Sequence, residues 1–243
     1  APIVSVLMGQ GTGGGALAGV GLACSAFCTS QLLAAVSAYA VAFVLYDYLP
    51  SGNGYKCRLV LKALELPYEL RQMNIVAGAT RTPEYLAINP NGKIPVLMVP
   101  GRGPIAESHA IINYLAEGSH LVPADRLERA RLWQWLCFEQ YSLEPNIGTA
   151  RFWIASLGRS EAELGEKLVE KRRNGHAALA VLEQGLAGRE FLVGNRYSLA
   201  DIALYAYTHV APEGGFPLDP YPAIRAWCAR VAAQPRHIPI TSR

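Results

Sequence analysis

Residues 91–108 read NGKIPVLMVPGRGPIAES. The run predicts a turn, a short apolar strand, a Pro-Gly turn and a second strand that ends at Glu107. Ser108 is then the expected N-cap of the next helix. A proline that opens a strand in a central sheet loses a ladder hydrogen bond, so Ile94-Pro95 is either a strand-start proline or a cis peptide. The stretch predicts the closing half of a small α/β unit.

The residues upstream predict the rest of that unit. A strand-like FVLY leads to the turn SGNG and a helical pattern that ends before Pro67. Thr82 and Pro83 then predict an N-cap followed by proline in the first helical turn. The expected elements are a strand at 43–46, a helix at 54–66, a strand at 68–75, a helix at 82–88, the two strands above and a helix at 109–118. This β-α-β-α-β-β-α order predicts a thioredoxin-like domain at 43–119, with parallel and antiparallel strands in one sheet.

The chain downstream of residue 126 predicts an all-helical domain that extends to residue 243. Long segments have a 3.6-residue apolar period, and no strand-like run bounded by turns remains. The expected helices are 126–157, 160–186, 198–209 and 221–233. Ser198 and Asp201 form a capping-box pattern at the start of the third.

Composition excludes several classes of protein. The 243 residues are 51% hydrophobic and 17% charged, which is enough for a sizeable core. The net charge of +3 comes from scattered Lys and Arg, so no nucleic-acid partner is expected. The five cysteines are odd in number and lack zinc-site spacing, which favours a reducing compartment and no metal.

The first 46 residues contain no charged side chain and no histidine. A secretory signal needs a basic region ahead of its apolar stretch, and none is present. A membrane anchor needs about 20 apolar residues, which only a weakly apolar run over residues 16–46 supplies. We favour a third interpretation, in which residues 1–42 are an extension with no role of their own, and we expect no membrane association unless residues 1–46 form an anchor.

Three motifs in sequence order resemble those of bacterial glutathione S-transferases: SGNGYKCR at 51–58, NGKIPVL at 91–97 and ESHAIINYLAE at 107–117. The helix start SLADIALY at 198–205 adds to the resemblance, which runs from residue 43 to the C-terminus. It implies the glutathione transferase fold, glutathione as co-substrate, a homodimer and a cytoplasmic role in detoxification. The N-terminal half is similar to the nu and zeta classes.

Glu107 and Ser108 are the candidate headgroup-binding pair. A plain N-cap explains the Ser108 hydroxyl, but a helix N-terminus also suits a carboxylate, and a neighbouring acid suits an ammonium group. The resemblance implies that this pair holds the γ-glutamyl end of glutathione. It also implies that Pro95 is cis and that the Ile94 backbone pairs with the cysteinyl unit. Lys93 and Asn91 are candidates for the glycyl carboxylate, although a solvated turn has the same composition.

Ser51 and Asn53 are the candidate catalytic residues. Donors at a helix N-terminus stabilise a thiolate, although Ser51 also suits a simple turn or cap. By resemblance, Ser51 stands where Ser-type transferases have their catalytic serine. The nu class pairs a threonine with an asparagine that corresponds to Asn53. Tyr48 is a reserve candidate.

The electrophile pocket is assigned to the long helix after the linker, from which we select Phe138, Tyr141 and Arg151, together with Tyr48. An aromatic stripe also suits core packing, and Arg151 also suits a surface salt bridge.

The resemblance therefore implies a glutathione transferase that conjugates or exchanges the glutathione thiolate with a small electrophilic or hydrophobic substrate. Two alternatives stay open: a glutathione-dependent disulfide-bond reductase or isomerase, and a non-catalytic glutathione-binding stress protein. The long helix differs in its aromatic pattern from that of the nu class, so the reductase activity of that class does not follow from the N-terminal match.

Overall fold

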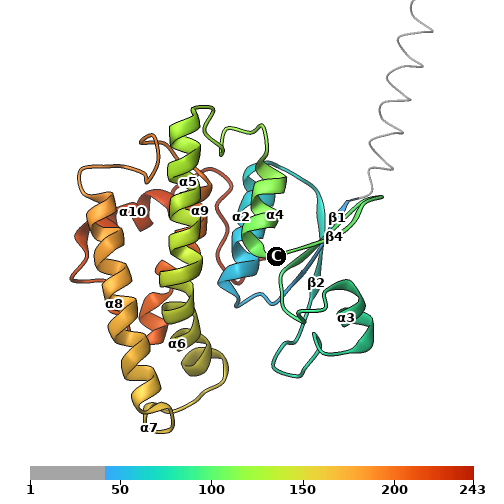
Figure 1. The fold of residues 1–243 in the computed structure, drawn as a ribbon, viewed down its shortest axis with the longest axis horizontal. Helices are drawn as coiled ribbons and strands as arrows, with labels where there is room; N and C mark the ends of the chain where they lie inside the picture. Colours follow the sequence, from blue (N-terminus) through green and yellow to red (C-terminus); the bar gives the residue numbers. More distant parts are fainter. Residues whose placement is uncertain (1–41) are drawn as a thin grey trace, which may run out of the picture. The chain divides into compact units, whose positions relative to one another are not determined.

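The α/β half is built on a four-stranded sheet in the order β2-β1-β3-β4 (Figure 1). The computed structural model describes residues 42–243, so the predicted extension lies outside the described residues except for Ala42. The strands are β1 (Phe43–Asp47), β2 (Tyr68–Gln72), β3 (Val96–Val99) and β4 (Gly103–Ala106). β1 pairs in parallel with β2 and antiparallel with β3, and β3 pairs antiparallel with β4. The mixed sheet of the predicted fold is confirmed.

Three helices accompany the sheet: α2 (Gly52–Ala63), α3 (Pro83–Ile88) and α4 (Ser108–Ala116). The predicted cap of α3 is present, because the Thr82 hydroxyl accepts a hydrogen bond from the Tyr85 backbone N–H at 3.3 Å. α2 and α4 pack against each other and both contact the helical half (Figure 1). α2 is therefore enclosed by protein, and nine of its residues are buried.

The second half is helical, as predicted. It contains α5 (Arg126–Phe138), α6 (Thr149–Arg151), α7 (Glu161–Leu164), α8 (Glu166–Leu186), α9 (Leu199–Thr208) and α10 (Pro222–Ala232). In the part of the chain that the structure describes, no helix has the length and apolarity needed to cross a bilayer.

The two longest predicted helices are interrupted. Wide π-type turns occupy Glu139–Gly148 and Phe152–Ser156, and Pro145, which has no N–H to donate, lies inside the first of them. The segment predicted as 160–186 divides at Gly165, whose φ of 50° is outside the helical range. The wide turns matter for function because their residues face the cavity described below.

Asp201 confirms the predicted capping box and extends it. Its fully buried carboxylate accepts hydrogen bonds from the Ser198 backbone N–H at 3.0 Å and hydroxyl at 2.9 Å. It also accepts from the Leu192 N–H at 3.0 Å and the Trp227 indole at 2.9 Å. One side chain thus joins the start of α9 to the preceding loop and to α10.

The Asp47–Arg58 ion pair fixes α2 on the sheet. Arg58 Nε donates to Asp47 Oδ2 at 2.8 Å, and both side chains are fully buried. The guanidinium also donates to the carbonyl oxygens of Leu49 and Ile240, both at 2.8 Å, so the C-terminal tail is held against α2 as well. A Cβ atom at Gly54 would lie 1.5 Å from Asp47 Oδ1, so only glycine permits this approach.

Gly54→Ala is expected to destabilise the protein by about 3–5 kcal/mol, because the added methyl group displaces the Asp47 carboxylate from Arg58 and breaks a buried pair. Chemical denaturation measures this change in the free energy of unfolding. Gly101→Ala is the comparison variant: its φ is 70° but its Cβ would meet nothing within 4 Å, so it should cost only about 1–2 kcal/mol. Equal losses in the two variants would contradict the steric argument.

Candidate active site

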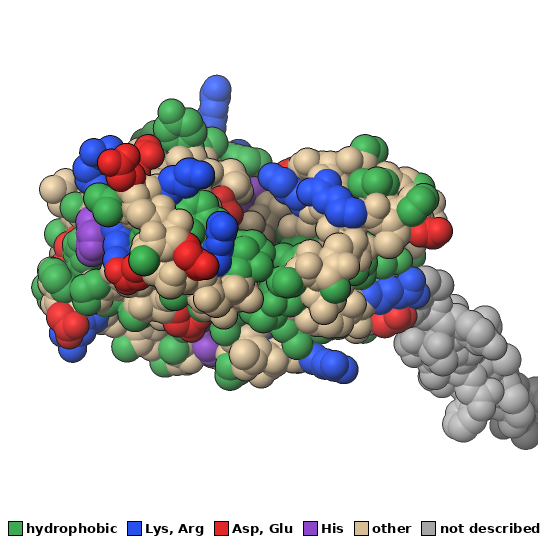
Figure 2. Space-filling view, turned by 90° about the horizontal axis from the view of Figure 1, so that it is seen from below, with side chains coloured by type: hydrophobic (Ala, Val, Ile, Leu, Met, Phe, Trp, Pro, Cys, Tyr) green, Lys and Arg blue, Asp and Glu red, His purple; other side chains and the backbone are tan. Residues whose placement is uncertain are grey.

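A cavity of about 400 Å³ opens between the α/β half and the helical half. Figure 2 shows a hollow between the two lobes, with Lys and Arg side chains on its rim. The α/β half contributes Tyr48, Pro50, Ser51, Asn53, Ile75, Thr80, Arg81, Asn89, Gly92, Lys93, Ile94, Pro95, Glu107 and Ser108. The helical half contributes Gln140, Glu144, Gly148, Thr149, Arg151, Phe152, Ser156 and Tyr207.

Ser51 lies at the N-terminus of α2 and lines the cavity. It occupies the N-cap position, with φ −76° and ψ 127°, yet its side chain makes no capping hydrogen bond. The hydroxyl therefore faces the cavity at the N-terminus of α2, where Ser51 and the Asn53 backbone N–H are hydrogen-bonded with the Tyr207 side chain.

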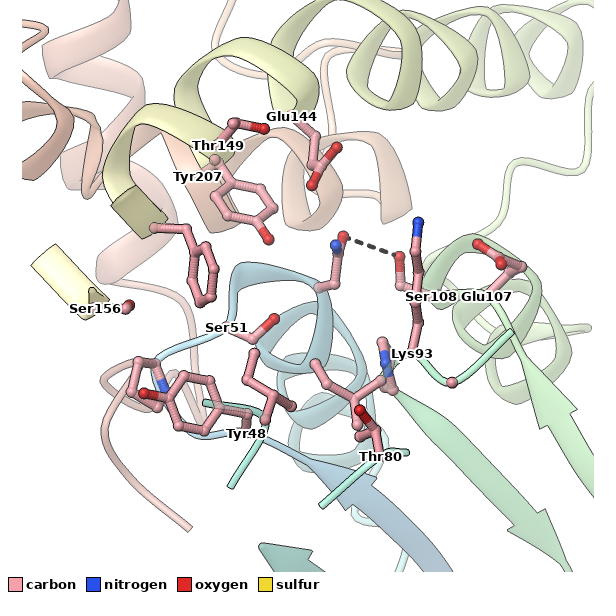
Figure 3. A pocket seen from close by; sticks show the side chains of 18 of the residues that line it. Tyr48, Ser51, Thr80, Lys93, Glu107, Ser108, Glu144, Thr149, Ser156 and Tyr207 are labelled. Atoms are coloured by element: carbon pink, nitrogen blue, oxygen red, sulfur yellow. Dashed lines mark hydrogen bonds between the residues drawn. The ribbon is translucent and has the colours of Figure 1, made fainter. Parts of the chain in front are cut away.

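Asn53 lies in that first turn, lines the cavity, and contacts Ser108 at the start of α4. Its Oδ1 accepts a hydrogen bond from Lys56 Nζ at 2.9 Å. It accepts a second from the Ser108 hydroxyl at 3.3 Å, which Figure 3 marks with a dashed line. With both donors on Oδ1, the Nδ2 amide group is the donor end of Asn53, and it faces the cavity, where Glu144 is its hydrogen-bond partner.

Lys56, Glu139 and His109 form a buried cluster that contacts Asn53 through Lys56. Lys56 Nζ lies 2.7 Å from Glu139 Oε2, and neither side chain is exposed. His109 Nε2 lies 3.0 Å from the same oxygen. Burial acts to raise the pKa of Glu139, but Lys56 and His109 together lower it, so the carboxylate is ionised.

Tyr207 of α9 reaches the cavity from the helical half, and its hydroxyl points toward the start of α2 (Figure 3). Ideal Cβ atoms at Gly52 and Gly148 would lie 2.7 and 2.9 Å from its ring. Both glycines therefore make room for this side chain. Burial raises the pKa of Tyr207, with Glu144 and Glu139 acting in the same direction, so the hydroxyl remains a neutral donor.

Glu107 and Ser108 form the wall next to Asn53. The backbone of Glu107 has φ 69° and ψ 119°, a conformation that L-residues rarely adopt and that concentrates at functional sites. Glu107 holds the N-cap position of α4, so the prediction that Ser108 is the cap is wrong. Ser108 is the first helical residue, and its hydroxyl is directed to Asn53 instead.

The Ile94-Pro95 peptide is cis, and both residues line the cavity. The Lys93 backbone carbonyl accepts hydrogen bonds from the Tyr85 hydroxyl at 2.8 Å and from Asn89 Nδ2 at 2.9 Å, which anchors the turn. The Lys93 side chain is exposed on the rim and forms no ion pair with any residue of the described range 42–243.

Arg81 is a second cation on this rim, and it donates to the Asn91 backbone carbonyl at 3.3 Å. The Asn91 side chain, a weaker candidate from sequence, is not among the groups that line the cavity.

The helical wall carries Glu144 and Arg151. Glu144 is half-buried. Burial raises the pKa of its carboxyl group, although the positive charge of Lys56 lowers it in part. Arg151 is buried, donates from Nε to Glu213 Oε2 at 2.7 Å and bonds the Pro50 carbonyl through Nη1. It therefore secures the loop before Ser51.

The structure does not bring the other two predicted pocket residues to the cavity. Phe138 stacks edge-on against Trp135 with ring centroids 5.5 Å apart, and the Tyr141 side chain is 86% exposed. Neither residue lines this cavity, where the wide turn that begins at Glu139 places Gln140 and Glu144 instead.

Several lining residues were not predicted from the sequence, among them Tyr207, Glu144 and Arg81. Arg81 had no local signal. Tyr207 lies in an apolar helix where an aromatic residue suits core packing, and its contact with Gly52 and Gly148 arises only in the folded chain.

Comparison with known proteins gives matches over most of the chain. Residues 41–117 match the family model described as glutathione S-transferase, N-terminal domain, and residues 139–235 match glutathione S-transferase, C-terminal domain. The disulfide-bond oxidoreductase YfcG of Escherichia coli is 32% identical over 196 residues, which are 77% of this chain and 89% of YfcG.

Two solved structures are similar in fold. A glutathione S-transferase from Pseudomonas fluorescens has a TM-score of 0.80 at 48% identity, over 82% of this chain and 99% of that chain. A glutathione transferase from Burkholderia graminis, solved with two glutathione molecules bound per subunit, has a TM-score of 0.70 at 29% identity, over 80% and 85% of the two chains.

The contribution of His109 to the stability of the protein should fall as the pH decreases below about 6.5. Burial and the Lys56 charge lower the pKa of His109 despite the opposing effect of Glu139. The unfolded chain therefore binds more protons than the folded chain in this range, and protonation favours unfolding. The free energy of unfolding, measured as a function of pH, tests this.

His109→Gln should reduce that slope without abolishing it, since His209 and His237 also have lowered pKa values. His120→Gln, which removes an exposed histidine, is the control. A slope unchanged by His109→Gln would contradict the assignment.

Proposed function

The chain belongs to the glutathione S-transferase family, and we propose that its cavity binds glutathione and transfers the thiolate to a small electrophile. One observation supports this most directly: Ser51 and Asn53, Ile94-Pro95, and Glu107-Ser108 come from three separate segments and surround one cavity. Ser51 and Asn53 suit the thiolate of glutathione, the Ile94-Pro95 backbone suits its extended chain, and Glu107-Ser108 suits its amino acid headgroup.

The thiol end of glutathione is assigned to the start of α2. A free thiol has a pKa near 8.5, and hydrogen-bond donors at a helix N-terminus lower it. The Ser51 hydroxyl and the Asn53 Nδ2 group are side-chain donors there, and the Tyr207 hydroxyl lies beside them. The thiol proton leaves to solvent, the thiolate attacks the electrophilic carbon, and the leaving group departs as its anion.

The other end of glutathione is assigned to Glu107 and Ser108. The Ser108 hydroxyl and the N-terminus of α4 suit the α-carboxylate, and the Glu107 carboxylate suits the ammonium group. The cysteinyl unit pairs with the Ile94 backbone as an added strand. Lys93 on the rim suits the glycyl carboxylate, with Arg81 beside it.

The electrophile is assigned to the space between Tyr48, Phe152 and Glu144. Two aromatic rings give it apolar walls, while Glu144, Thr149 and Ser156 supply polar groups. A small aromatic electrophile with a hydrogen-bond donor suits this lining.

A second candidate function is glutathione-dependent disulfide reduction, which the similarity to the YfcG oxidoreductase favours. Among the described residues, no cysteine lines the cavity, so the reaction needs a glutathione thiolate that attacks a glutathione mixed disulfide and releases the substrate thiolate with oxidised glutathione. Turnover of a mixed disulfide, measured beside turnover of a chloroarene, separates the two activities. Retention on immobilised glutathione with neither turnover would instead indicate the non-catalytic binding protein.

We further propose a cytoplasmic homodimer, as the family resemblance implies. A hollow lined by Asn113, Tyr114, Glu117, Val122, Arg129, Leu132 and Trp133 is consistent with a subunit contact. Tyr114 and Trp133 are 43% and 49% exposed there, which is unusual for adjacent aromatic side chains.

Ser51→Ala and Asn53→Ala are each expected to lower kcat/KM for conjugation of chlorodinitrobenzene by about 10–100-fold, because each removes one hydrogen bond to a charged sulfur. The pKa of bound glutathione, read from thiolate absorbance, should rise in parallel. Ser142→Ala removes a hydroxyl from a residue of the Glu139–Gly148 turn that does not line the cavity, and is the matched control. Wild-type rates in both Ser51→Ala and Asn53→Ala would overturn the thiolate site.

Glu107→Gln should raise KM for glutathione about tenfold with a smaller change in kcat, since it removes the charge that faces the ammonium group. Steady-state kinetics with cysteinylglycine, which lacks the γ-glutamyl unit, provides the cross-check. Wild-type protein should discriminate strongly between the two thiols, and Glu107→Gln should discriminate less. Glu170→Gln, which changes an exposed acid on α8, is the control, and equal KM values in wild type and Glu107→Gln would contradict the headgroup assignment.

A further inference from the structure

Lys56 is a lysine with no exposed surface, one turn below the proposed thiolate site. Lysine and glutamate are rarely buried completely unless they are paired. Lys56 meets this condition through Glu139 at 2.7 Å, and His109 binds the same carboxylate oxygen at 3.0 Å. The cluster therefore joins α2, α4 and the helical half at one point.

The cluster is poorly explained by stability alone. Replacing a buried ion pair by apolar side chains of similar volume is often neutral or stabilising. In addition, the second carboxylate oxygen of Glu139 is buried without a hydrogen-bond partner in the described part of the chain, which adds a desolvation cost. A buried charge in this position therefore points to a role beyond packing.

The second contact of Lys56 indicates that role. Its ammonium group lies 2.9 Å from Asn53 Oδ1, and an ammonium group donates but never accepts hydrogen bonds. Only the oxygen of the Asn53 amide is stable on that side. The Ser108 hydroxyl donates to the same oxygen at 3.3 Å and reinforces the orientation. The NH2 end of the amide must then face away from Lys56, toward the cavity that Asn53 lines.

Glu139 and His109 hold Lys56 in this position. Lys56 donates to the Asn53 amide oxygen at 2.9 Å and to Glu139 Oε2 at 2.7 Å. His109 donates its Nε2–H to the same carboxylate oxygen at 3.0 Å. With its donors directed by these groups, the ammonium group keeps one orientation, and so does the amide.

We propose that Lys56, held by Glu139 and His109, is a positioning residue that orients the Asn53 amide so that its NH2 group stabilises the glutathione thiolate. This inference rests on the proposed function, because it needs a thiolate at the start of α2. Lys56 acts through Asn53 and does not touch the sulfur. Its effect is therefore on the pKa of the bound thiol and on kcat, with little effect on the capture of glutathione.

The test is a double-mutant cycle on the full chain. Lys56→Met is combined with Glu139→Gln, so that no unpaired charge remains buried. The double variant should raise the pKa of bound glutathione by about one unit, which is a tenfold shift of the ionisation equilibrium toward the thiol, while KM for glutathione changes less than about twofold. Thiolate absorbance against pH and steady-state kinetics give the two readouts. Lys62→Met, which removes a lysine from the far end of the same helix, is the matched control and should leave both unchanged.

Asn53→Ala completes the cycle. If Lys56 acts through Asn53, adding Lys56→Met and Glu139→Gln to Asn53→Ala raises the thiol pKa no further. A further rise would overturn the inference in favour of a direct charge effect. A normal thiol pKa in the Lys56 double variant, with a raised pKa in Asn53→Ala, would overturn the inference and leave the proposed function intact. An unchanged pKa in Asn53→Ala itself would contradict the thiolate site and the inference with it.

Lys56→Arg keeps a cation that can only donate hydrogen bonds beside the Asn53 amide. It provides an independent test if the Lys56→Met, Glu139→Gln variant fails to fold. It should keep the wild-type thiol pKa. A raised thiol pKa in folded Lys56→Arg would count against the inference.

Discussion

The complete burial of two cations on helix α2 is the constraint on which the rest of the structure depends. Arg58 pairs with Asp47 on the sheet, and Lys56 pairs with Glu139 on the helical half. A buried charge without its partner costs several kcal/mol, so both halves must meet α2 in one register. The start of α2 is consequently fixed from two sides.

This fixed position explains the glycines of the SGNG turn. Gly54 permits the Asp47 carboxylate to approach from the sheet, and Gly52 permits the Tyr207 ring to approach from α9. Glycine is needed in each case for space and not for a left-handed backbone. With both neighbours packed this closely, Ser51 and Asn53 are presented to the cavity on a rigid helix terminus, where a small displacement would weaken a bond to sulfur.

Much of the fold was predictable because each element carries its own local signal. Thr82 and Pro83 start α3, Ser198 and Asp201 start α9, and a proline before an apolar run precedes β3. The errors arose where a local pattern suited two structures. Ser108 looked like an N-cap, but Glu107 takes that position. The apolar period of residues 126–157 did not reveal the wide turns near Pro145.

The sequence by itself determined the order of the elements, the two halves of the fold and the three segments that reach the cavity, because caps, prolines and apolar periods act over a few residues. Tertiary structure decided which side chains complete the site. Lys56 and Glu139 are 83 residues apart, and Arg151 binds the loop at Pro50 across 101 residues. No local pattern encodes such pairs, since their energy comes from desolvated charges that meet only after the two halves have packed.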